Sequence, residues 1–168
     1  HAGVGLATDG DADRFGIIDD ACRSVSPNLA IALLVDYLLN RRRLRGGVGR
    51  TLATTRLVDR VARAAGCPVH ETPVGFHFFG PMLLSGEVVV ATEESAGLGV
   101  ASHLPERDGI YAALLVAEML AVEGASLSEL TRRLFARHGT LVSRRVQLPL
   151  RERTRAVLAL LMATGTNC

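Results

Sequence analysis

The segment DGDADR, residues 9–14, places aspartates at alternate positions: Asp9, Asp11 and Asp13. Side chains at alternate positions of an extended segment point the same way, so these three carboxylates should converge. Converging carboxylates repel one another, and a hard divalent cation with oxygen ligands, Mg²⁺ or Ca²⁺, removes that cost. The spacing therefore predicts a metal-binding loop rather than a solvated acidic turn, the other common use of Asp and Gly.

A calcium loop of the EF-hand type is a second interpretation, because Asp20 is the twelfth residue counted from Asp9. That loop requires glycine at its sixth position, where this chain has Arg14, and a helix before it. Residues 4–8 instead have the apolar pattern of a strand. The calcium loop is therefore the weaker interpretation.

The elements that must position this loop alternate along the chain. Apolar runs predict strands at 4–8, 16–20, 48–55, 68–72 and 87–92. Helices are predicted at 27–43, 56–66, 109–124, 127–139 and 151–165 from helical spacing and from caps at Ser26-Pro27, Asp108 and the pair Ser126/Glu129. A further helix is predicted at 74–86, with an interruption at Gly80-Pro81, and 140–148 is a strand or a connector. Strand–helix alternation from 48 to 123 predicts an α/β fold: a mainly parallel sheet with helices on both faces.

Polar segments follow the expected strands directly. They are the acidic loop at 9–14, the threonines at 54–55, TPVGFH at 72–77 and EESAG at 93–97. In open α/β sheets, ligands bind outside the carboxyl ends of strands. These four segments are therefore expected to face one ligand.

Composition limits the class of protein. Apolar residues make up 48% and charged residues 21% of 168 residues, which is typical of a globular domain with a core. The net charge of +2 gives no reason to expect a nucleic-acid partner, and no apolar run of membrane-spanning length is present. Three cysteines without metal-like spacing, and no visible secretory signal, predict reduced thiols in the cytoplasm.

Four ordered motifs resemble the α-D-phosphohexomutases, the phosphoglucomutase/phosphomannomutase superfamily. They are TDGDADRFGIIDD (8–20), ETPVGFHFFGPM (71–82), ATEESAG (91–97) and HLPERDGIYAALLVAEML (103–120). The resemblance implies an isomerase that moves a phosphoryl group between positions 1 and 6 of a hexose, glucose or mannose, through a bisphosphate intermediate. It also implies an enzyme phosphoserine and a requirement for Mg²⁺.

By this resemblance, Asp9, Asp11 and Asp13 ligate Mg²⁺, and Arg14 lies against the phosphoserine. Glu93 and Ser95 would hydrogen-bond the sugar hydroxyls, and Arg107, which stands where the family has lysine, would bind substrate. Because phosphoryl transfer depends on positioning and charge neutralisation, this residue set suits it.

The segment after residue 74 adds two further candidates. Gly75, at an expected helix start, would let backbone N–H groups approach an anion. His77 stands where many relatives have lysine, and it is either a catalytic general acid/base or a polar helix residue without a chemical role.

This sequence also departs from the family pattern. The family loop has the pattern Gly-Glu-x-Ser-Gly, and this chain has Thr92 and Ala96 in place of the two glycines. Each replacement adds a Cβ to a tight loop. Neither a phosphoserine loop nor the C-terminal phosphate loop of the family is found in the 168 residues.

The missing motifs predict a fragment that is inactive alone and needs the missing domains of its parent chain. The expected parts are 1–21, the end of domain II with the metal loop; 22–140, domain III with the sugar loop; and 141–168, a linker and the start of domain IV. The alternative is a non-catalytic α/β module that binds a sugar phosphate or a metal.

Overall fold

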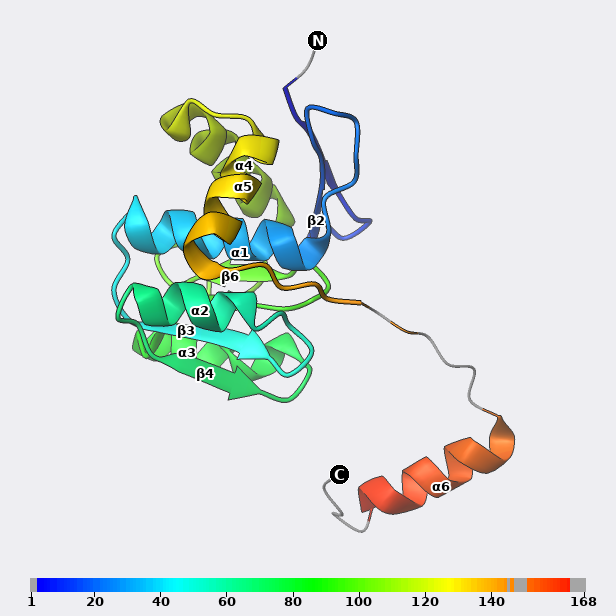
Figure 1. The fold of residues 1–168 in the computed structure, drawn as a ribbon. Coiled ribbons are helices and arrows are strands. Elements are labelled where there is room, and N and C mark those ends of the chain that lie inside the picture. The colour runs from blue at the N-terminus through cyan, green and yellow to red at the C-terminus, as the bar shows by residue number, and fades with distance from the viewer. Residues whose placement is uncertain (1–2, 145, 147–150, 164–168) are drawn as a thin grey trace.

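The computed structural model describes residues 3–144, 146 and 151–163, and its centre is a four-stranded sheet (Figure 1). The strands β3 (Gly47–Thr51), β4 (Val69–Thr72), β5 (Val88–Thr92) and β6 (Leu98–Val100) lie in the order β4-β3-β5-β6. Strand β3 pairs in parallel with both β4 and β5, whereas β6 pairs antiparallel with β5. The prediction of a mainly parallel sheet is therefore confirmed.

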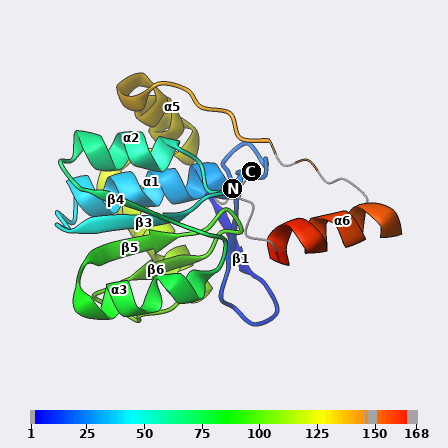
Figure 2. The same ribbon diagram turned by 90° about the horizontal axis from the view of Figure 1, so that it is seen from below.

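Helices cover both faces of this sheet, as predicted (Figure 2). One face carries α1 (Pro27–Asn40) and α2 (Leu57–Ala64), and the other carries the short α3 (Gly80–Ser85). The helices α4 (Gly109–Glu123) and α5 (Leu127–His138) pack against α1, and α6 (Glu152–Ala163) is the last described element.

Helix α1 is the centre of the larger hydrophobic core. Its N-cap is Ser26, whose hydroxyl accepts a hydrogen bond from the amide of Leu29, and Pro27 occupies the first helical position, as predicted. Every residue from Ala30 to Leu39 is buried. A helix that is apolar all round must be covered all round, and the sheet, α2, α4 and α5 cover this one.

The first two strands form a separate antiparallel pair, β1 (Gly5–Thr8) with β2 (Phe15–Ile18). The acidic loop connects them and packs against the start of α4, where the amide of Gly109 donates to the carbonyl of Ala12 at 2.8 Å. Because strands flank the loop, the EF-hand interpretation is wrong.

The predicted elements differ from the observed ones chiefly in three places. The segment 74–86 is two helices, a 3₁₀ turn η1 (Phe76–Phe78) and then α3, because Pro81 cannot continue a helix through its missing N–H. Strand β3 ends at Thr51, since the chain turns there through a hydrogen bond from the amide of Thr54 to the carbonyl of Thr51. Strand β6 was not predicted.

The C-terminal predictions are tested only in part. Residues 140–144 and 146 contain no strand, so within the described residues the segment 140–148 is a connector, and 145 and 147–148 lie outside them. The helix predicted at 151–165 is observed at 152–163, and 164–165 also lie outside the described residues.

None of the described helices has, by itself, the length and apolar composition of a membrane span. Helices α4 and α5 meet both criteria only when taken as a pair, and they are bent by 83° relative to each other.

Candidate active site

The acidic loop brings its three aspartates together. One carboxylate oxygen from each of Asp9, Asp11 and Asp13 lies within 4.8 Å of the other two. Two oxygens that ligate one Mg²⁺ at 2.1 Å are at most about 4.2 Å apart, so small rotations of these side chains would have to bring the three oxygens closer for all of them to ligate one ion. The donor set, oxygen atoms only, also fits a hard cation.

Arg14 closes the acidic loop. Its Nε lies 2.5 Å from Asp9 and 3.3 Å from Asp13, and its amide donates to Asp9 at 3.2 Å. Desolvation raises the pKa of Asp9, but the hydrogen bonds and charge of Arg14 outweigh it, so the pKa lies below its ordinary value of 3.8. Asp9 is therefore ionised at neutral pH, as a metal ligand must be.

The turn between β5 and β6 carries the predicted sugar-binding residues. Glu93 is 4% exposed, and its amide donates to the carbonyl of Gly97 at 2.9 Å, which tightens the turn. Ala96 adopts the left-handed conformation, with φ of 71°, at a position where the family pattern has glycine. The added Cβ is therefore accommodated in a backbone conformation that glycine adopts more easily.

The acidic loop and this turn lie side by side. Arg14 and Gly97 form an antiparallel β-bridge, and Ser95 lines a pocket of about 270 Å³ together with Asp9 and Arg14. The sequence expectation that these two polar segments meet is therefore confirmed for the described residues.

Arg107 connects the two loops through its guanidinium group. One terminal nitrogen lies 2.7 Å from Asp13 in the acidic loop, and the other donates to Glu93 at 2.8 Å. A Cβ at Gly97 would lie 2.5 Å from Cδ of Arg107, so the glycine provides the space that this side chain occupies. A planar fork with two donors is suited to such a double contact.

The segment that contains Gly75 and His77 joins the site through its neighbour Phe76. The guanidinium carbon of Arg107 lies 5.6 Å from the centre of the Phe76 ring, a cation–π distance. Gly75 has φ of 135°, which other residues rarely adopt. The His77 ring is exposed and lies 4.1 Å from that of Phe78, and no hydrogen bond or ion pair links it to the acidic loop within the described residues.

Two residues of the site were missed by sequence reasoning. Gly109 begins α4, where a Cβ would lie 2.4 Å from the carbonyl oxygen of Arg14, so glycine lets the helix approach the acidic loop. Glu94, which has no predicted role, accepts a hydrogen bond from Thr51 at the end of β3. The signal for Gly109 was its place after Asp108, which caps α4 through the amide of Tyr111.

Comparison with known proteins identifies this arrangement. Residues 26–138 match the family model "Phosphoglucomutase/phosphomannomutase, alpha/beta/alpha domain III". The chain therefore belongs to the phosphoglucomutase/phosphomannomutase family.

Individual relatives are similar over most of this chain. It is 34% identical to a phosphoglucomutase from Komagataeibacter xylinus, over 92% of this chain and 29% of the relative. The crystal structure of a Thermus thermophilus protein assigned as a phosphomannomutase matches with a TM-score of 0.77 and 38% identity, over 81% of this chain and 31% of that one. Parafusin, a phosphoglucomutase from Paramecium, matches with a TM-score of 0.71 and 30% identity, over 82% and 25%. The chain thus spans under a third of the length of these relatives.

Proposed function

We propose that this chain is part of a phosphohexomutase that interconverts the 1- and 6-phosphates of a hexose, glucose or mannose, in the cytoplasm. Residues 1–21 would be the end of its domain II, 22–140 its domain III, and 141–168 a linker with the start of domain IV. The rest of the parent chain would supply the phosphoserine and the second phosphate-binding loop.

The observation that supports this proposal most is the double contact of Arg107, 2.7 Å from Asp13 and 2.8 Å from Glu93. A mutase must hold a phosphoryl group and a sugar ring in one geometry, because its catalysis depends on alignment and charge neutralisation. A guanidinium that contacts both loops keeps the distance between them constant.

The positions of the remaining residues support a proposed role for each. Asp9, Asp11 and Asp13 would hold Mg²⁺, which supplies positive charge against the phosphoryl oxygens when bound. Arg14 would donate to the phosphoserine, and Glu93 and Ser95 would accept from and donate to hydroxyls of the sugar. These roles need no proton transfer within the acidic loop.

The segment from Gly75 to His77 would meet the sugar phosphate. Gly75 leaves backbone N–H groups open to an anion, and His77, with an exposed ring, would act as the general acid/base. The neighbouring Phe76 lies against the guanidinium group of Arg107, which supports a place for this segment at the site.

The test is a coupled assay of the full-length parent with glucose 1-phosphate or mannose 1-phosphate and Mg²⁺. We expect conversion of at least one substrate, and a loss of about 100-fold in kcat/KM for Arg107→Gln, because two charge-assisted hydrogen bonds are lost. Arg56→Gln, which removes an arginine that is 71% exposed, should change kcat/KM by less than about twofold.

Absence of turnover with these sugars and with amino-sugar analogues would contradict the proposal. Tight binding of a sugar phosphate without turnover would favour the alternative, a non-catalytic binding module. Equal effects of the two arginine variants would show that Arg107 has no special role.

A further inference from the structure

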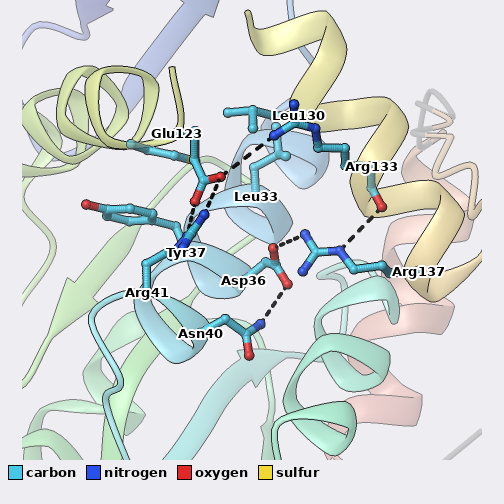
Figure 3. A pocket seen from close by; sticks show the side chains of 10 residues that line it. Leu33, Asp36, Tyr37, Asn40, Arg41, Glu123, Leu130, Arg133 and Arg137 are labelled. Carbon is cyan, nitrogen blue, oxygen red and sulfur yellow. Dashed lines mark hydrogen bonds and ion pairs between the residues drawn. The ribbon is translucent and has the colours of Figure 1, made fainter. Parts of the chain in front are cut away.

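A larger pocket, of about 420 Å³, lies apart from the acidic loop, among α1, α4 and α5 (Figure 3). None of the residues that line it belongs to the candidate active site. Its volume is within the range of about 300–1,000 Å³ that is usual for small-molecule sites. A function for this pocket would therefore be separate from the proposed phosphoryl transfer and does not depend on it.

The floor of the pocket is apolar and comes from all three helices. Leu33 of α1, Met119 of α4 and Leu130 of α5 line it, and they are only 4%, 2% and 6% exposed. Tyr37 also lines the pocket (Figure 3). Because these side chains are almost covered, they offer a ligand only a small apolar contact area, which favours a compact apolar or aromatic body.

The mouth of the pocket is charged, with more cations than anions. Three arginines line it, Arg41 after α1 and Arg133 and Arg137 of α5, against two carboxylates, Asp36 and Glu123. Figure 3 shows the arginine and carboxylate side chains pointing toward one another across the gap between the helices. The lining therefore carries a formal excess of one positive charge.

Glu123 contacts two of the three guanidinium groups, those of Arg41 and Arg133. It accepts two hydrogen bonds from Arg41, at 2.5 and 3.1 Å, and lies 3.9 Å from Arg133. The hydrogen bonds of Arg41, together with the charges of Arg133 and Arg137, lower the pKa of Glu123. Because the carboxylate of Glu123 would repel a second oxyanion, an anionic ligand would have to contact the guanidinium groups on the sides that face away from it.

Each of the three arginines retains an unused donor nitrogen. Within the described part of the chain, Nη1 of Arg41, Nη2 of Arg133 and Nη1 of Arg137 donate no hydrogen bond. The three arginine side chains are 59%, 47% and 51% exposed, whereas their carboxylate partners Glu123 and Asp36 are only 14% and 11% exposed. A ligand can therefore use these donors without breaking a buried pair.

We propose that this pocket binds a small organic anion, with an apolar or aromatic body on the floor and one phosphate or carboxylate group at the three guanidiniums. Arginine suits such a group because it offers forked N–H donors to planar or tetrahedral oxyanions. A free inorganic anion would leave the floor empty, and a neutral aromatic would leave the donors unused. The two features together define the ligand class.

The test uses phenyl phosphate as the probe, titrated calorimetrically into the 168-residue chain without Mg²⁺. We expect one site per chain, with benzoate binding at the same place and with benzyl alcohol and inorganic phosphate each at least about tenfold weaker. Arg133→Gln should weaken phenyl phosphate by about tenfold, because one charge-assisted contact is lost. The two carboxylates that pair with Arg133 each retain another arginine, because Glu129 also pairs with Arg132 and Glu123 also pairs with Arg41. We therefore expect the Arg133→Gln variant to fold.

Two matched controls make the result specific. Arg132→Gln removes the neighbouring arginine, which is 76% exposed and does not line the pocket, and it should change the affinity by less than about twofold. Arg14→Gln, in the acidic loop, should also leave the affinity unchanged. Arg41→Gln repeats the test on a different element, and circular dichroism verifies that each variant is folded.

Several outcomes would overturn the proposal. Absence of phenyl phosphate binding, or equal weakening by Arg132→Gln and Arg133→Gln, would mean that the arginines form an ordinary charged surface. Loss of binding in Arg14→Gln would place the probe in the candidate active site. Equal affinity for benzyl alcohol would mean that the guanidiniums do not take part.

Discussion

At the scale of single residues, Arg107 and Ala96 have the largest consequences for the candidate site. Arg107 was predicted only as a substrate-binding residue, whereas it also pairs with Asp13 and Glu93. The sequence motif around Arg107 could not indicate those partners, because Asp13 and Glu93 lie 94 and 14 positions away in sequence. Ala96 was recognised from the family pattern as an added Cβ, but its backbone conformation became known only from the structure.

Replacement of Ala96 by glycine should stabilise the chain. The left-handed conformation costs a non-glycine residue about 1–2 kcal/mol, and glycine would remove this strain. The greater freedom of glycine in the unfolded chain offsets about 0.4–1 kcal/mol of the stability gained. We therefore expect the free energy of unfolding in urea to rise by about 0.5–1 kcal/mol. The control is Ala112→Gly within α4, also fully buried, which should lower it by about 1 kcal/mol. A decrease in both variants would mean that residue 96 is not strained.

At the scale of elements, two contacts hold the strands and helices that position the site. One is the cap of α4, where Asp108 accepts from the amide of Tyr111 at 2.8 Å and lies 2.8 Å from His103, whose ring stacks on Tyr111. The other is a buried ion pair between Arg50 of β3 and Asp59 of α2. The cap was predicted from sequence, but the ion pair was not.

The cap predicts a dependence of stability on pH. Desolvation raises the pKa of Asp108, but the hydrogen bonds from Tyr111 and His103 outweigh it, so the folded pKa lies below the ordinary 3.8. The charge of Asp108 therefore adds to the free energy of unfolding above about pH 4. This contribution is lost as the pH falls through the pKa that Asp108 has in the folded chain.

The comparison that tests this cap is Asp108→Asn, which can still cap the helix but has no charge. Wild type should be more stable than the variant at about pH 6, and the difference should shrink as the pH falls below 3.8 and through the folded pKa of Asp108. Urea unfolding at each pH measures it. A difference that stays constant with pH would contradict the assigned role of the charge.

Removal of the buried ion pair should destabilise the chain strongly. Arg50 is 2% exposed and its side chain contacts Asp59, Glu71 and the carbonyl of Thr51. Asp59→Ala would leave the guanidinium without its buried partner, at a cost of about 3–5 kcal/mol in the free energy of unfolding.

Arg63→Ala is the control for this prediction. Arg63 pairs with the same aspartate at 3.5 Å but is 69% exposed, so its loss should cost less than about 1 kcal/mol. Equal costs for the two variants would contradict the role assigned to burial.

At the scale of the whole molecule, the chain places the acidic loop beside the turn between β5 and β6 but spans under a third of the length of its relatives. We therefore predict that the isolated 168-residue chain converts neither glucose 1-phosphate nor mannose 1-phosphate, because the phosphoryl donor would lie elsewhere in the parent. The full-length parent is the positive control in the same assay. Turnover by the isolated chain that is lost in Asp11→Asn would contradict this division of roles.

The pattern of residues by itself determined the α/β class, most element bounds and the acidic loop, because these follow from local periodicity, caps and spacing. It also identified the family, since four ordered motifs lie within one continuous stretch. The tertiary structure alone decided which loops touch, the pairing of β6, the partners of Arg107 and the pocket among α1, α4 and α5. Strand β6 has only three residues, Leu98–Val100, and is a strand only because β5 provides its hydrogen-bond partners. Contacts between distant segments depend on how helices pack on the sheet, and local sequence does not encode that packing in any single stretch.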